Sequence, residues 1–232
     1  MHTPTDRMTP PSSRRRFMRS SAVTVGSLLG LELATRTPMR AQSTLTPDAA
    51  LQELMAGNAR FVANQMTSFE HDLQILKQHT VDKQEPFASV LSCADSRVPV
   101  ELLFDQTINH IFVNRVAGNV ITSEIIASIE YGAAVLGTKV IVVLGHANCG
   151  AVKATIQAKS VPGQISALYP HIQAAVDQAG SNLEAATKTN AKMQAELLSK
   201  ASTVIAGLLK EKKVKVVAGY YDIGSGAVTL LS

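Results

Sequence analysis

The sequence predicts an α/β fold in which a mostly parallel central β-sheet is flanked by helices. Two short apolar runs, residues 87–91 and 140–144, are bounded by polar residues, which is typical of buried strands. Between them lie a third apolar run and a segment of helical periodicity. Strand, helix and strand in this order and of these lengths form parallel units, because the crossover needs a helix.

A helix is expected to precede the sheet as an N-terminal arm. Thr46 is a good N-cap residue, Pro47 suits the first helical turn and Asp48 suits the positive end of the helix dipole. Apolar residues then recur at helical spacing from Leu51 to Val62, so the helix has one apolar face.

The remaining elements follow from the same patterns. A strand is expected from about His110, and residues 165–212 read as two long helices broken at Gly180. Two apolar runs near the C-terminus, joined at Gly224-Ser225-Gly226, predict a hairpin at the edge of the sheet. Further helices are expected over 99–104, 123–136 (capped by Ser123 and Glu124) and 150–158.

One globular domain, residues 42–232, is expected to follow a leader of residues 1–41. The chain has 232 residues and 46% hydrophobic content, enough to bury one core. Its formal charge of +4 resides in the leader, which holds seven of the 22 basic side chains but only two of the 18 acidic ones. The domain is therefore nearly neutral, and its charge does not indicate a nucleic-acid partner.

In the leader, a basic segment precedes an uncharged segment, as in an export signal. Residues 13–19 (Ser-Arg-Arg-Arg-Phe-Met-Arg) precede an uncharged stretch, 20–31, that is too short to span a bilayer as a helix. Paired arginines followed by phenylalanine resemble a twin-arginine signal. We therefore expect export to a bacterial periplasm by the twin-arginine translocation machinery, with cleavage near Ala41. The alternatives are an uncleaved tether and a basic tail without a targeting role.

Chemically active side chains follow two of the predicted strands. Cys93, Asp95 and Arg97 come after the first, and His146 and Cys149 come after the second. Carboxyl ends of adjacent parallel strands meet at one edge of a sheet, so these residues are expected to lie together. Two thiolates and an imidazole suit zinc, and three protein ligands leave a fourth position for water or substrate.

Other interpretations of these residues stay open at this point. Cys93 and Cys149 are the only cysteines, and in an oxidising compartment they could form a disulfide. The neighbouring His146, Asp95 and Arg97 favour a metal site instead. Asp95 could either orient a metal-bound water or become the fourth ligand, and a bidentate contact with Arg97 would choose between these states.

These motifs resemble those of the β-class carbonic anhydrases. The family pattern is Cys-x-Asp-Ser-Arg followed by His-x-x-Cys-Gly, here residues 93–97 and 146–150. Segments 54–61, 112–119 and 219–226 also resemble family segments, so the likeness covers roughly 46–231. The resemblance implies reversible hydration of carbon dioxide to bicarbonate and a proton by a zinc-bound hydroxide, with one zinc per chain held by Cys93, His146 and Cys149.

The resemblance also implies roles for four other residues. Asp95 would orient the hydroxide, and Arg97 would keep Asp95 ionised. The Gln106 side chain and the Gly150 backbone amide would bind substrate, and the presence of Gln106 is typical of family members with an open metal site. The chain departs from the family at Val116, where asparagine is usual. A homodimer or dimer of dimers is expected, with the N-terminal helix lying across the partner.

Two further functions are compatible with the same ligands. One is hydrolysis of carbonyl sulfide or carbon disulfide on the same scaffold, which pocket lining and access would distinguish. The other is a non-catalytic zinc- or bicarbonate-binding protein in which Asp95 permanently closes the metal site. The presence of Asp95, Arg97 and Gln106 favours the enzyme.

Overall fold

The computed structural model of the chain describes residues 43–68, 78 and 80–232. The predicted export signal lies outside these residues. Among the helices that are described, none combines the length and the hydropathy needed to cross a bilayer.

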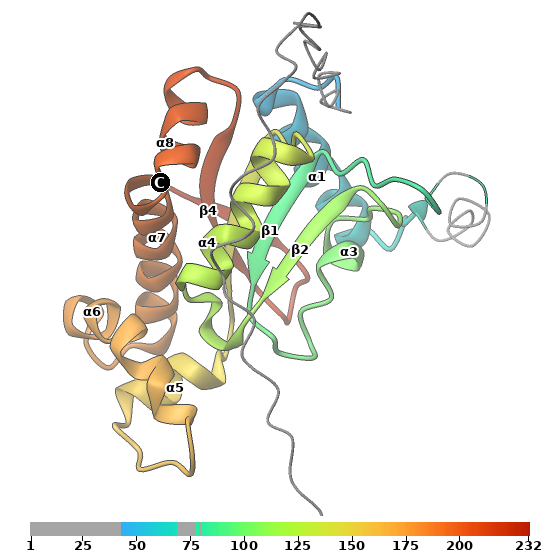
Figure 1. The fold of residues 1–232 in the computed structure, drawn as a ribbon. Coiled ribbons are helices and arrows are strands. Elements are labelled where there is room, and N and C mark those ends of the chain that lie inside the picture. The colour runs from blue at the N-terminus through green and yellow to red at the C-terminus, as the bar shows by residue number, and fades with distance from the viewer. Residues whose placement is uncertain (1–42, 69–77, 79) are drawn as a thin grey trace, which may run out of the picture. The chain divides into compact units, whose positions relative to one another are not determined.

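The centre of the fold is a five-stranded sheet in the order β2-β1-β3-β4-β5 (Figure 1). β1 (Ala88–Ser92), β2 (Ile111–Arg115), β3 (Val140–His146) and β4 (Lys215–Tyr221) pair in parallel. β5 (Val228–Leu231) pairs antiparallel with β4. The structure thus confirms the mostly parallel sheet, the flanking helices and the C-terminal edge hairpin.

The strand order creates a switch point between β1 and β3. From β1 the chain crosses to β2 on one side, and then returns past β1 to β3 on the other side. Crossovers therefore leave β1 and β3 in different directions, which opens a crevice at their carboxyl ends, the usual ligand site of open α/β sheets. Every residue of both strands is buried, as expected for central strands of a parallel sheet.

Helices cover both faces of this sheet. α1 (Pro47–Val62) and α3 (Val100–Leu103) pack on one face. α4 (Ser123–Glu130), α7 (Leu183–Ala201) and α8 (Thr203–Lys210) pack on the other. Successive strand residues alternate between the two layers: Val90 and Val142 face the α1 layer, whereas Leu91 and Val143 face the α7 layer.

The predicted N-terminal helix is confirmed, and it is fastened to the sheet of its own chain. The Thr46 side chain accepts a hydrogen bond from the Ala49 amide at 3.2 Å, as an N-cap does. The Asn58 amide is buried and donates to the carbonyls of Leu103, at 2.9 Å, and Gly226, at 3.0 Å. It therefore ties α1 both to α3 and to the C-terminal hairpin.

Several helix boundaries differ from the expected ones. The helix over 123–136 ends at Glu130 and continues as a π-helical segment, Tyr131–Val135, and its N-cap is Thr122, without a side-chain cap bond. Residues 165–212 form three helices rather than two, because the chain breaks at Ser202, whose hydroxyl accepts from the Ile205 amide at 3.0 Å. The other helices are α5 (Gly150–Ile156), α6 (Tyr169–Ala179) and the short 3-10 segments Ala117–Asn119 and Ile165–Leu168.

Asp105 is a fully buried carboxylate that joins α1 to the segment after α3. Its carboxylate accepts from Arg60 Nε at 2.5 Å and from the amides of Thr67, at 2.9 Å, and Ser68, at 3.0 Å. Burial raises the pKa of Asp105, but the Arg60 guanidinium and the two amides outweigh it and hold the pKa below its usual range. The folded state therefore favours the ionised carboxylate.

Replacing Asp105 by asparagine is expected to lower the free energy of unfolding at neutral pH by about 2 kcal/mol, because Arg60 loses its buried partner. The pKa of Asp105 is lower in the folded than in the unfolded chain, so its contribution is present above about pH 4 and is lost as the pH falls. Urea unfolding of wild type and Asp105→Asn should therefore converge at acid pH. The exposed Asp48→Asn is the control, and a gap that stays constant with pH would contradict the analysis.

Candidate metal centre

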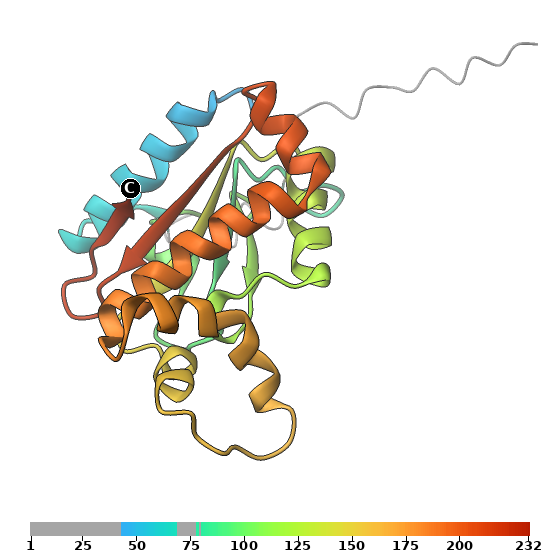
Figure 2. The ribbon, with the colours of Figure 1, turned by 90° about the vertical axis from the view of Figure 1, so that its left-hand side faces the viewer.

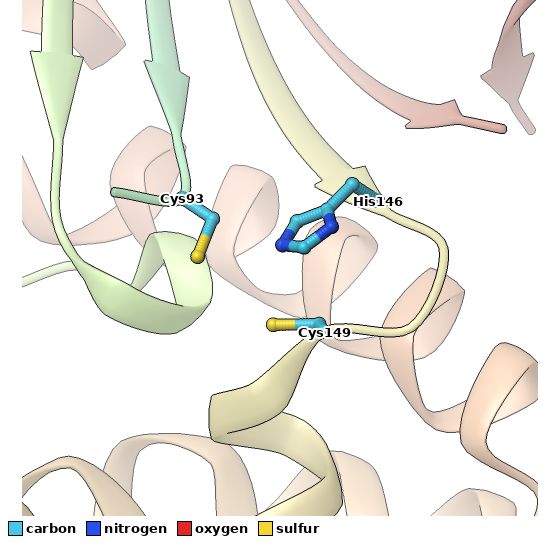
Figure 3. Close-up of side chains that lie close together, drawn as sticks. All are labelled: Cys93, His146 and Cys149. Atoms are coloured by element: carbon cyan, nitrogen blue, oxygen red, sulfur yellow. The ribbon is translucent and has the colours of Figure 1, made fainter. Parts of the chain in front are cut away.

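Three side chains converge at the carboxyl ends of β1 and β3 (Figure 3). Cys93 follows β1 directly, His146 is the last residue of β3, and Cys149 is the N-cap of α5. All three are buried, and their ligand atoms lie within 4.8 Å of one another. The structure therefore brings together the three residues that the sequence suggested as metal ligands, at the switch point between β1 and β3.

The orientation of His146 prepares one ring nitrogen for a metal. Nδ1 lies 2.9 Å from the carbonyl oxygen of Ala147, which can only accept, so Nδ1 carries the proton. Nε2 then presents its lone pair, and it is buried without a hydrogen-bond partner among the described residues. An unsatisfied buried nitrogen of this kind costs about 1–3 kcal/mol, which a metal bound there would offset.

Each of the two thiols changes the pKa of the other. A hydrogen bond from the Cys149 thiol, opposed by burial and supported by the Gly118 amide, holds the pKa of Cys93 well below its usual value. The same contact and burial raise the pKa of Cys149. The pair thus holds one negative charge readily and a second only with a cation beside it. A buried set of two sulfurs and one imidazole fits zinc.

Backbone amides also point at the sulfurs. The sequence indicated an amide of the turn after Cys149, that of Gly150, but not those of Gly118, Ala151 and Val152. The Gly118 amide donates to Cys93 Sγ at 3.3 Å, and Gly118 has a φ of 75° that favours glycine. The amides of Ala151 and Val152, in the first turn of α5, approach the Cys149 sulfur and favour its thiolate. The glycine of the Ala-Gly-Asn segment was the available signal for the first of these contacts.

Asp95 is paired with Arg97 rather than directed at the cluster. Arg97 donates from Nε to Oδ1 at 2.9 Å and from Nη2 to Oδ2 at 2.8 Å, a bidentate contact. This guanidinium holds the pKa of Asp95 far below its usual range. Asp95 Oδ2 lies 4.0 Å from His146 Nε2, so the carboxylate borders the cluster without entering it. This arrangement corresponds to the alternative in which Asp95 is not a metal ligand and the fourth position stays open.

Two arginines hold the loops that carry the cysteines. Arg97 Nη2 also donates to the Asn148 carbonyl at 3.3 Å, which links the loop after β1 to the loop after β3. Arg115, at the end of β2, donates to the carbonyls of Cys93, at 3.0 Å, and Asp95, at 2.5 Å. Arg115 therefore fixes the backbone of the Cys93 loop, a role that the sequence did not specify.

Gln106 does not lie beside the cluster of its own chain. Its Nε2 donates to Glu53 of α1 at 3.1 Å, and its Oε1 lies 3.2 Å from His110 Nδ1. His110 precedes β2, and its carbonyl accepts from the Phe87 amide just before β1. Gln106 is thus at the amino ends of the strands, whereas the cluster is at the carboxyl ends, about 16 Å away for a five-residue strand.

Gly150 begins α5 directly after Cys149 and is exposed. A Cβ at this position would meet no atom within 4 Å, so space does not require a glycine. The first-turn amides that contact the cluster belong to the next two residues and are directed at the Cys149 sulfur. Substrate binding by the Gly150 amide stays a prediction.

The family model described as carbonic anhydrase matches residues 88–228 of the chain. A carbonic anhydrase of Mycolicibacterium smegmatis is 48% identical over 114 residues, which cover 48% of this chain and 54% of that protein. The match thus spans about half the length of this relative. A carbonic anhydrase of Pseudomonas aeruginosa is 28% identical over 197 residues, covering 78% of this chain and 87% of that protein.

Solved structures share the fold. The β-carbonic anhydrase CafA of Aspergillus fumigatus superposes with a TM-score of 0.65 at 24% identity, covering 78% of this chain and 90% of that one. A tetrameric β-carbonic anhydrase of Sordaria macrospora gives 0.62 at 20% identity, covering 78% and 96%. The chain belongs to the carbonic anhydrase family, and its fold is that of the β class.

Proposed function

We propose that the protein catalyses the reversible hydration of carbon dioxide to bicarbonate and a proton. One observation carries this proposal: a buried Cys-His-Cys set that fits zinc lies beside Asp95, and both carboxylate oxygens of Asp95 accept hydrogen bonds from Arg97. Because Arg97 occupies both oxygens of Asp95, the fourth position of the metal is left for water or substrate. This favours an enzyme over a protein with a permanently closed site. The names of the relatives support the same activity.

Cys93, His146 and Cys149 would hold the zinc, which when bound supplies the Lewis acidity that makes water nucleophilic near neutral pH. Asp95 is held ionised by Arg97. Its Oδ1 accepts from both the backbone amide and Nε of Arg97, whereas Oδ2 accepts only from Nη2 and keeps a free lone pair. It can accept a hydrogen bond from the attacking water and so fix its orientation toward the carbon of carbon dioxide. Arg97 acts through Asp95, whose position and charge it sets.

Zinc content and stopped-flow hydration of carbon dioxide test metal and mechanism together. Wild type should contain about one zinc per chain and hydrate carbon dioxide rapidly. Cys149→Ser should lose both properties. Arg97→Ala should keep the zinc, because Arg97 touches none of the ligand atoms, but should lose hydration by about 100-fold, because Asp95 is no longer held. Stoichiometric zinc without hydration in wild type, at neutral or alkaline pH, would refute the proposed activity.

We also propose that the active unit is at least a homodimer, in which Gln106 serves the metal centre of the partner. Within one chain Gln106 lies at the opposite edge of the sheet from the cluster, beside Glu53 on α1. Substrate binding by Gln106 therefore requires a second chain. The Sordaria macrospora relative is described as tetrameric, which supports assembly of this kind.

Mixing two inactive variants tests this arrangement. Gln106→Leu and Cys149→Ser are each expected to hydrate carbon dioxide poorly. In a hybrid dimer, the intact cluster of one chain meets the intact Gln106 of the other. Co-refolding should therefore restore activity, up to about one quarter of wild type for random pairing into symmetric dimers. If Gln106 acted within its own chain, the mixture would be no more active than its two components.

For the leader, we propose export by the twin-arginine route with removal of residues 1–41. The support is the run of arginines at 14–16, followed by Phe17 and an uncharged stretch. Expression of the full chain in a bacterium should yield a periplasmic protein whose first residue lies near 42. Replacing Arg14 and Arg15 by lysine should retain it in the cytoplasm. A membrane-associated product with an intact N-terminus would show a tether instead.

A further inference from the structure

Helix α7 presents a row of polar side chains to the interior of the fold. Figure 2 shows α7, in orange-red, lying across the sheet, where it contacts β3 and β4. Thr187, Asn190 and Gln194 follow one another at helical spacing and are all buried. Buried amides on a helix that could have packed with leucine or alanine require a reason, because each must be fully hydrogen-bonded.

Asn190 contacts the residue whose amide reaches the metal centre. Its Nδ2 donates to the carbonyl of Gly118 at 2.9 Å, and the Gly118 amide donates to Cys93 Sγ at 3.3 Å. Gly118 and Asn119 both have left-handed backbone conformations, with φ of 75° and 46°. Two such residues in succession are uncommon, so the conformation depends on contacts that hold it in place.

Gln194 fixes the orientation of Asn190. Its Nε2 donates to Asn190 Oδ1 at 3.2 Å and to the carbonyl of His171 at 2.8 Å, while its Oε1 accepts from the Ile121 amide at 2.8 Å. The amide groups of Asn190 and Gln194 therefore have partners on both their oxygen and their nitrogen. A network satisfied in this way is rigid, and it holds the segment from Gly118 to Ile121 at both ends.

The same helix supports the strand that ends in His146. A Cβ at Gly145 would lie 3.1 Å from Thr187 Cγ2 and 3.3 Å from Ala191 Cβ, so α7 packs closely against the end of β3. α7 thus contacts the residue before one ligand and, through Gly118, the sulfur of another.

We propose that Asn190, held by Gln194, is a positioning residue that keeps the Gly118 amide on the Cys93 sulfur and so limits the charge that this sulfur donates to the metal. The inference rests on the metal centre proposed above. Groups that hydrogen-bond to metal ligands set both the geometry and the donor strength of those ligands. An amide held at this sulfur withdraws electron density from it and fixes its direction.

Cobalt(II) in place of zinc provides the readout, since its thiolate-to-metal charge-transfer band reports the electron density on sulfur. In Asn190→Leu, a variant of similar size that cannot hold Gly118, this band should shift to longer wavelength because the sulfur becomes the stronger donor. Release of zinc to a chelator should nevertheless be about 10-fold or more faster than from wild type, because the Cys93 sulfur is no longer held in a fixed direction. Ser202→Ala is the matched control: it removes a different buried polar contact, the bond to Glu130, at the far end of α7.

The outcomes separate a positioning role from a structural one. Ser202→Ala should lower the thermal stability without moving the band. An Asn190→Leu band that coincides with the wild-type band would overturn the inference. Should that variant fail to fold, Gln194→Met, which frees the Asn190 amide, should show a smaller shift in the same direction, and an unchanged band would again overturn it. Absence of any thiolate-to-cobalt band in wild type would instead refute the metal centre itself.

Discussion

The parallel pairing of β1 with β3 is the constraint on which the site depends. Their register sets Ser92 opposite Leu144, so the loop after β1 and the end of β3 emerge at the same edge of the sheet. Cys93 follows at once on one side and His146 two residues later on the other. A slip of one residue would turn His146 to the opposite face, because side chains alternate along a strand. The two fully buried apolar runs prevent such a slip, since each of their residues is packed.

Much of the fold could be predicted because short, local sequence patterns specify many of its elements. The Thr46 cap, the apolar runs and the glycine turn before β5 each specify an element on their own. The break at Ser202 could not be found in this way, because a serine within a helical pattern is ambiguous until its partner is known. The Ser202 hydroxyl accepts from the nearby Ile205 amide, but it also donates to Glu130, which is 72 residues away in the sequence.

The candidate site likewise has a part that could be predicted from the sequence and a part that could not. The ligands were predictable because their chemistry is carried by their side chains: thiols and an imidazole at two strand ends suit few other purposes. The backbone groups that support these ligands could not be predicted. The amides of Gly118, Ala151 and Val152 belong to residue types that any loop could contain, and only the folded path directs them at sulfur. Gln106 exposes a different limit: the family resemblance assigns it to substrate, whereas the fold places it beside Glu53, at the opposite edge of the sheet from the cluster of its own chain.

The negative charge of the two thiolates and of Asp95 explains why hydrogen-bond donors lie around the cluster. Two thiolates, even with zinc, leave a buried centre without excess positive charge, and Asp95 adds a further negative group at its border. Arg97 pairs directly with Asp95, whereas the backbone groups that reach the sulfurs are amide dipoles, among them those of Gly118 and the first turn of α5. Amides stabilise thiolate without neutralising it, so the sulfurs remain strong metal ligands. Their effect depends on distance and direction, and this makes the remote helix α7, which fixes the Gly118 peptide through Asn190, part of the electrostatics of the site.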